Sequence, residues 1–73
     1  MPRKGGGAMY IKYRDESSWT VAGPLRWITW RPLKDKSIEI IYSLVDDEKS
    51  YSLVVNTEAY LLNNEGNTME KIL

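Results

Sequence analysis

The chain has 73 residues, with ten basic and ten acidic side chains and a formal net charge of zero. It contains no cysteine and no histidine, which excludes disulfides, thiolate nucleophiles, and the side chain most often used as a general acid–base or zinc ligand. A chain of this length forms one domain at most and buries only about 60% of its unfolded surface. Its stability must therefore come from packing within the domain or against a partner.

Residues 1–7 form a basic, glycine-rich segment. Arg3 and Lys4 precede Gly5–Gly7, whose backbone has maximal conformational freedom. We expect a flexible arm in which Arg3 and Lys4 contact phosphates if the partner is a nucleic acid. An artificial extension left by cloning would have the same pattern. We expect residues 8–73 to form a single small β-rich domain.

The first half of the domain has two simple strands. Residues 8–14 alternate between two sets of side chains, which predicts a half-buried strand. The polar stretch 15–18 predicts a turn. Residues 19–22 form a second short strand that ends at the turn signal Gly23–Pro24.

Residues 25–31 do not fit a simple inside–outside alternation. Leu25 and Trp27 share one face, whereas Ile28 and Trp30 share the other. The segment is therefore either covered on both sides or leaves one tryptophan near the surface. Pro32 indicates an edge or the end of a strand.

The second half contains the clearest hairpin. Residues 37–45 and 50–56 alternate regularly and flank the charged connection 46–49. The C-terminal part is ambiguous, because residues 58–64 could form a short helix that begins after Thr57 and ends near Gly66. The alternative is a hairpin of strands 59–62 and 68–73, which we favour since seven residues make a weak isolated helix.

These segments predict a mainly β fold. We expect a small antiparallel sheet of five to six short strands, barrel-like or folded into a small sandwich, with a short helix near 58–64 as the alternative. No apolar run is long enough to span a bilayer, and the basic N-terminus is not followed by the apolar segment of a secretory signal. We therefore expect a cytoplasmic protein with no membrane contact.

The charges are divided unequally along the chain. Residues 1–34 carry seven basic and two acidic side chains, whereas residues 35–73 carry three basic and eight acidic ones. Such asymmetry can indicate a nucleic-acid or protein contact. The simpler interpretation, which we favour, is that the two halves neutralise each other across neighbouring strands.

No motif indicates catalysis. The acidic cluster Asp46–Glu48 lacks the spacing of a calcium loop, the serines lack a nucleophile context, and Gly5–Gly7 is not a phosphate-binding loop. We therefore predict a protein that is not an enzyme, with no catalytic residues, no metal site, no cofactor and no small-molecule substrate.

The segment around residues 24–36 is the candidate binding site. With no phenylalanine in the chain, we expect at least two of the three tryptophans to be buried, which leaves Trp30 or Trp27 exposed beside arginines. Tryptophan and arginine are enriched in protein-binding hot spots. The predicted partner-binding residues are these two tryptophans and three nearby cations, namely Trp27, Trp30, Arg26, Arg31 and Lys34.

We favour a protein partner. By analogy of size and composition alone, the chain resembles small phage-encoded or accessory regulators that inhibit a larger host machine such as RNA polymerase or another nucleic-acid enzyme. The alternative function is single-stranded nucleic-acid binding on an aromatic and basic β surface. The zero net charge argues against that alternative, because nucleic-acid-binding domains are typically basic.

Overall fold

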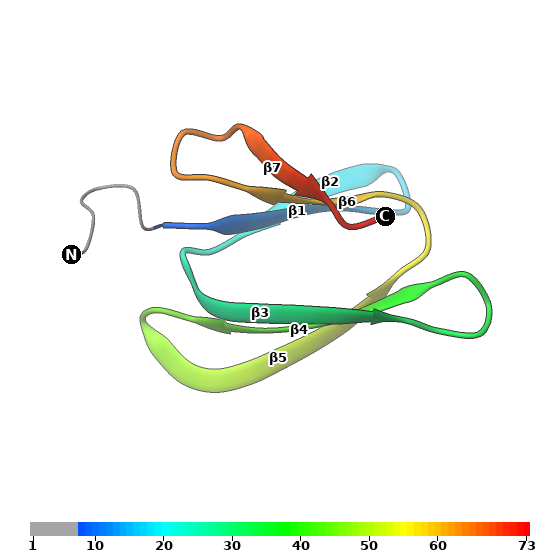
Figure 1. The fold of residues 1–73 in the computed structure, drawn as a ribbon, viewed down its shortest axis with the longest axis horizontal. Coiled ribbons are helices and arrows are strands. Elements are labelled where there is room, and N and C mark those ends of the chain that lie inside the picture. Colours follow the sequence, from blue (N-terminus) through cyan, green and yellow to red (C-terminus); the bar gives the residue numbers. More distant parts are fainter. Residues whose placement is uncertain (1–7) are drawn as a thin grey trace.

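In the part of the chain that the structure describes, seven β-strands form two antiparallel sheets that face each other (Figure 1). A computed structural model describes residues 8–73, and the predicted basic arm at 1–7, with Arg3 and Lys4, lies outside the described residues. The strands are β1 (Tyr10–Asp15), β2 (Ser18–Ala22), β3 (Leu25–Pro32), β4 (Ile38–Leu44), β5 (Asp47–Val55), β6 (Ala59–Leu62) and β7 (Thr68–Lys71).

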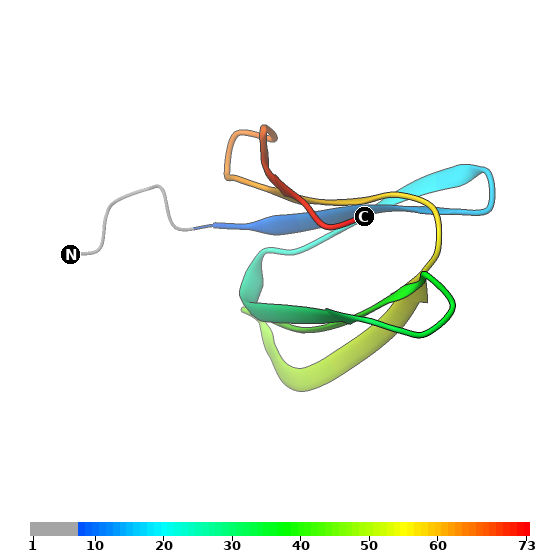
Figure 2. The ribbon, with the colours of Figure 1, turned by 45° about the vertical axis from the view of Figure 1, so that its right-hand side comes forward.

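The strands of one sheet come from two separate parts of the chain, whereas the strands of the other are consecutive. The four-stranded sheet has the order β2-β1-β6-β7, and the three-stranded sheet has the order β3-β4-β5. The chain leaves the first sheet after the β1–β2 hairpin, completes β3, β4 and β5, and then returns to place β6 beside β1 (Figure 2). The sheets do not close into a barrel.

The core lies between the inner faces of the two sheets. Ile11 of β1 and Ile40 of β4 are fully buried at its centre. Alternation along each strand brings one side chain in two to this interface. The buried cluster is completed from both sheets by Leu25, Tyr42, Val55, Ala59, Leu61 and Ile72.

The mainly β class is confirmed, but the expected number of strands was too low. The C-terminal hairpin that we favoured is confirmed as β6 and β7, which brings the strands of residues 8–73 to seven, and the alternative helix at 58–64 is wrong. β6 lies between β1 and β7, so its backbone groups find partners on both sides that a single isolated helical turn would lack. The Asn63 side chain closes the connecting turn by accepting hydrogen bonds from the backbone N–H groups of Glu65 (2.8 Å) and Asn67 (3.0 Å).

A β-bulge explains why residues 25–31 break the alternation. Leu25 pairs with Leu44, but the next pairing joins Trp27 to Ser43, so Arg26 is an extra residue in β3. The extra residue reverses the alternation. Ile28 therefore joins Leu25 in packing against the core, whereas Arg26 and Trp27 are both exposed.

The expectation that at least two tryptophans are buried is wrong. Trp30 is half-buried and packs against the core, but Trp19 and Trp27 are 44% and 39% exposed. Tyrosines and aliphatic side chains fill the space that we had assigned to tryptophan: Tyr42 lies in the core, and its ring stacks on Tyr51 with centroids 5.5 Å apart.

Among residues 8–73, two ion pairs join the basic half of the chain to the acidic half. The Arg31 Nε lies 2.8 Å from the Glu39 carboxylate across β3 and β4, and Arg14 Nη1 lies 3.5 Å from Glu58. Both pairs fit the cross-strand neutralisation that we favoured. Over residues 8–73, no helix has the length and apolar character needed to cross a membrane.

Candidate binding surfaces

Exposed aromatic side chains are the features of this surface that a partner could recognise. Within residues 8–73, no group of acidic side chains is arranged to hold a metal ion. A small open pocket of about 140 Å³ lies between the ends of β1 and β5, lined by Tyr13, Arg14, Asp15, Leu53, Val54 and Val55. Neither exposed tryptophan lines that pocket. Trp19 and Trp27 lie on the outer faces of the two sheets, which are therefore the candidate binding surfaces.

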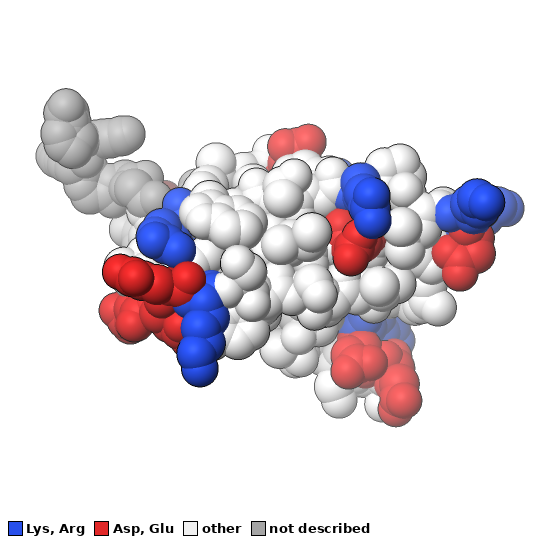
Figure 3. All heavy atoms as spheres, turned by 90° about the horizontal axis from the view of Figure 1, so that it is seen from below, with Lys and Arg blue, Asp and Glu red and all other residues white. Residues whose placement is uncertain are grey.

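The outer face of the three-stranded sheet is the first candidate, and we name it the Trp27 surface. Strand register places on it the side chains that alternate with the core residues: Arg26, Trp27, Thr29 and Arg31 of β3, Glu39, Ile41 and Ser43 of β4, and Ser50, Ser52 and Val54 of β5. Seen from this side, charged side chains gather at the left end, in a pair right of centre and at the right tip, and the stretch between the left group and the pair carries none among the described residues (Figure 3). The Trp27 surface is therefore apolar and hydroxyl-bearing at its middle and charged at its ends.

The bulge fixes Arg26 beside Trp27. Arg26 Nε and Nη2 donate to the Ser43 hydroxyl at 3.2 and 2.9 Å, and Nη2 also reaches the Glu48 carbonyl at 3.4 Å. Ser43 is fully buried, and its hydroxyl donates in turn to the Asp47 carbonyl at 3.5 Å. The guanidinium is thus held in one place while its residue stays exposed, which lowers the entropy lost when a partner binds it.

Asp47 begins β5 at the same end of the Trp27 surface. Its carboxylate accepts hydrogen bonds from the Tyr51 hydroxyl and from the Lys49 backbone N–H. The hydrogen bond from Tyr51 is the main cause that lowers the pKa of Asp47 below its ordinary value, and the bond from Lys49 is the next. The hydrogen bond between Tyr51 and Asp47 also raises the pKa of Tyr51. The carboxylate therefore stabilises this corner in its charged form.

We expect the Asp47→Asn variant to lose part of the acid sensitivity of folding. A lowered folded-state pKa contributes stability that is present above the unfolded-state pKa of about 3.9 and is lost as the pH falls through the folded value. Urea unfolding between about pH 2 and pH 7 measures this dependence. Some dependence should persist, because hydrogen bonds from Ser37 also lower the pKa of Asp35. An Asp46→Asn variant is the matched control, and an equal effect in both variants would contradict the assignment.

The structure brings together only part of the site predicted from the sequence. Arg26 and Trp27 are neighbours on the Trp27 surface, and Arg31 shares that face but is paired with Glu39. Lys34 is exposed in the turn between β3 and β4. Trp30 lies on the inner side of β3 and packs against the core, away from the other predicted residues.

Sequence reasoning missed a second aromatic surface, on the outer face of the four-stranded sheet. We name it the Trp19 surface. Register places on it outward side chains from all four strands: Trp19 and Val21 of β2, Tyr10, Lys12 and Arg14 of β1, Tyr60 of β6, and Lys71 of β7. The signal was present in the β1–β2 hairpin, because a turn centred on residues 16–17 sets Trp19 opposite Arg14.

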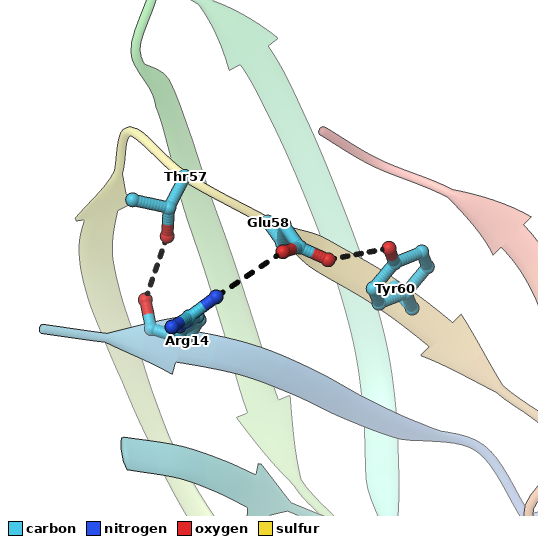
Figure 4. A network of polar contacts seen from close by, with 4 residues as sticks. All are labelled: Arg14, Thr57, Glu58 and Tyr60. Carbon is cyan, nitrogen blue, oxygen red and sulfur yellow. Dashed lines mark hydrogen bonds and ion pairs between the residues drawn. The ribbon is translucent and has the colours of Figure 1, made fainter. Parts of the chain in front are cut away.

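The Trp19 ring lies among cations and a second aromatic ring. Lys12 Nζ is 4.9 Å from its centroid, Arg14 Cζ is 6.0 Å away, and the Tyr60 ring is 6.1 Å away at a tilt of 32°. Figure 4 shows the contacts that hold this group: Glu58 lies between Arg14 and Tyr60, whose hydroxyl donates to it at 2.8 Å. That hydrogen bond raises the pKa of Tyr60, which keeps its hydroxyl protonated.

Comparison with known proteins gives no relative. No family model matches the chain, no curated protein matches its sequence, and no solved structure matches its fold.

Proposed function

We propose that this protein is a non-enzymatic binding protein that docks onto a larger protein through the Trp27 surface. The observation that supports the proposal is the exposed Trp27 ring beside an Arg26 guanidinium fixed by Ser43, next to a stretch without charged side chains. Tryptophan and arginine are the residues most enriched among binding hot spots.

The distribution of charge on this face favours a protein partner. Burying its middle removes few charged groups from water, so the desolvation cost is low. The exposed hydroxyls of Thr29, Ser50 and Ser52 can form hydrogen bonds to a partner. The charges at both ends suit the polar rim that surrounds the buried centre of a typical interface.

In this proposal the protein acts as a stoichiometric regulator that occupies a surface its partner needs. The partner class that size and composition favour is a large nucleic-acid enzyme such as RNA polymerase, and the effect is inhibition or locking of that enzyme. The Trp27 surface supplies the anchor, whereas Trp30 contributes to the core beneath it.

Quantitative capture from a nuclease-treated lysate tests the proposal. We expect wild-type protein on a resin to retain a defined partner, and the Trp27→Ala variant to lose most of it, because truncating a hot-spot tryptophan costs about 2–4 kcal/mol. Nuclease treatment removes partners that are bridged by nucleic acid. Trp19→Ala, which changes the opposite sheet, is the matched control and should retain the partner.

Equal recovery with wild type and Trp27→Ala would contradict the proposal. Light scattering of the purified protein adds an independent arm. A mass that rises with concentration in wild type but not in Trp27→Ala would assign this face to a second copy of the chain instead of a different protein.

A further inference from the structure

The Trp19 surface differs from the Trp27 surface in charge. Its outward side chains include three cations, Lys12, Arg14 and Lys71. Among the described residues, Glu58 is the one carboxylate that forms an ion pair with any of them. Aromatic rings lie between the cations, since Tyr60 pairs with Lys12 on one side and with Lys71 on the other. A protein of zero net charge thus presents a locally basic face with the exposed Trp19 ring and the half-buried Tyr60 ring.

We propose that the Trp19 surface binds single-stranded nucleic acid, with bases stacked on Trp19 and Tyr60 and phosphates bound by Lys12, Arg14 and Lys71. This inference concerns the sheet opposite the Trp27 surface and does not depend on the proposed protein partner. The two aromatic centroids are 6.1 Å apart, close enough for neighbouring nucleotides of one strand to reach both rings. Such platforms bind with little sequence preference, because every base offers a flat face.

The contacts that now occupy Trp19 are weak enough to be replaced. Lys12 lies over the ring, but a cation–π contact at an exposed site strengthens an association by only about 2- to 5-fold. A stacked base contributes about 5- to 150-fold. A base therefore displaces the Lys12 ammonium from the Trp19 ring, and the ammonium stays close enough to bind the phosphate of the same strand.

Arg14 can also exchange its partner. Its nitrogen is 3.5 Å from the Glu58 carboxylate, and both side chains are about 40% exposed, so the pair adds little to stability. A phosphate offers the guanidinium a bidentate partner instead. Glu58 would then repel the nucleic acid, so its charge limits the affinity of the wild-type surface.

The two aromatic rings, Trp19 exposed and Tyr60 half-buried, favour nucleic acid over an acidic protein. A polyanion of carboxylates would satisfy the three cations but would leave Trp19 and Tyr60 without a stacking partner. A duplex hides the flat faces of its bases within the stack, so it would leave Trp19 and Tyr60 without a stacking partner. Single strands use both the rings and the cations.

Fluorescence anisotropy of a labelled single-stranded oligonucleotide of about 12 nucleotides tests the proposal, with the full chain at about 50 and 200 mM salt. We expect saturable binding that weakens as salt rises. Trp19→Ala should weaken it by about 5- to 150-fold. Lys12→Ala should lower the slope of log affinity against log salt by about 0.7. Glu58→Gln, which keeps an acceptor for Tyr60, should tighten binding.

Trp27→Ala on the opposite sheet is the matched control, and circular dichroism of each variant establishes that it is folded. The proposal is overturned if no saturable binding occurs at low salt, or if Trp27→Ala weakens binding as much as Trp19→Ala. It is also overturned if polyglutamate competes as well as the oligonucleotide at equal charge, because the surface would then recognise negative charge alone. Stronger binding to duplex than to single strands would overturn it as well.

Discussion

Replacing Ile40 with alanine is expected to lower the free energy of unfolding by about 2–5 kcal/mol. A chain of 73 residues has a total stability of only about 4–11 kcal/mol, so this one substitution should remove a large share of it. Ile40 has no exposed surface, lies on the central strand of the three-stranded sheet, and pairs with Trp30 and Leu53. Removing its side chain opens a cavity against both sheets, with neither disulfide nor cysteine elsewhere to compensate.

Urea unfolding followed by tryptophan fluorescence measures this loss. Val54→Ala is the matched control, because Val54 lies on the neighbouring strand but faces outward and is 59% exposed. Its truncation should cost less than about 1 kcal/mol. Equal losses in the two variants would show that the core is not where the two sheets meet.

The strands could be predicted from the sequence because their signals are local. Alternation over 37–45 lies close to the observed β4, and the turn at Gly23–Pro24 separates β2 from β3 as expected. The hairpin partner was expected at 50–56, but β5 begins at Asp47, so most of the predicted connection 46–49 is strand. Each of these features depends on side-chain period and turn chemistry within a few residues.

The arrangement of the strands depends on contacts between distant residues, which a local pattern does not encode. Nothing near residues 59–62 indicates that β6 inserts beside β1, more than 40 positions earlier in the chain. The C-terminal hairpin that we favoured is confirmed as β6 and β7, because its turn and alternation are local signals, whereas the pairing of β6 with β1 is not.

The candidate site was predicted only in part, because a bulge and long-range strand pairing decide which side chains share a face. Arg26 and Trp27 were expected near each other, but strict alternation would have put them on opposite faces, and only the bulge brings them together. Trp30 was expected among them and instead packs against the core. The Trp19 surface was missed because it joins β2, β1 and β6, and its third strand arrives from the far end of the chain.

Gly23 lies in the connection between the two sheets, and we expect Gly23→Ala to lower the free energy of unfolding by about 2–5 kcal/mol. Gly23 has a φ of +152°, a conformation that side chains rarely adopt, which accounts for about 1–3 kcal/mol. A Cβ atom here would also lie 2.9 Å from the Met9 carbonyl oxygen and 2.5 Å from Tyr10 Cδ2. The Met9 oxygen accepts the Leu25 N–H at 2.8 Å, so moving it strains the contact between β1 and β3.

The close approach can be separated from the backbone strain with a second glycine. Gly66 also has a positive φ, +86°, but a Cβ there would meet nothing within 4 Å. Gly66→Ala should therefore cost only the strain of a left-handed residue, about 1–2 kcal/mol. Because the closest backbone contact at Gly23 is a carbonyl oxygen, Tyr10→Ala should rescue Gly23→Ala only in part. Urea unfolding of Gly23→Ala, Gly66→Ala, Tyr10→Ala and the Gly23→Ala/Tyr10→Ala double variant separates the two causes. Full rescue in the double variant would assign the whole loss of stability at Gly23 to the clash with the Tyr10 ring, and equal losses at both glycines would assign it to φ alone.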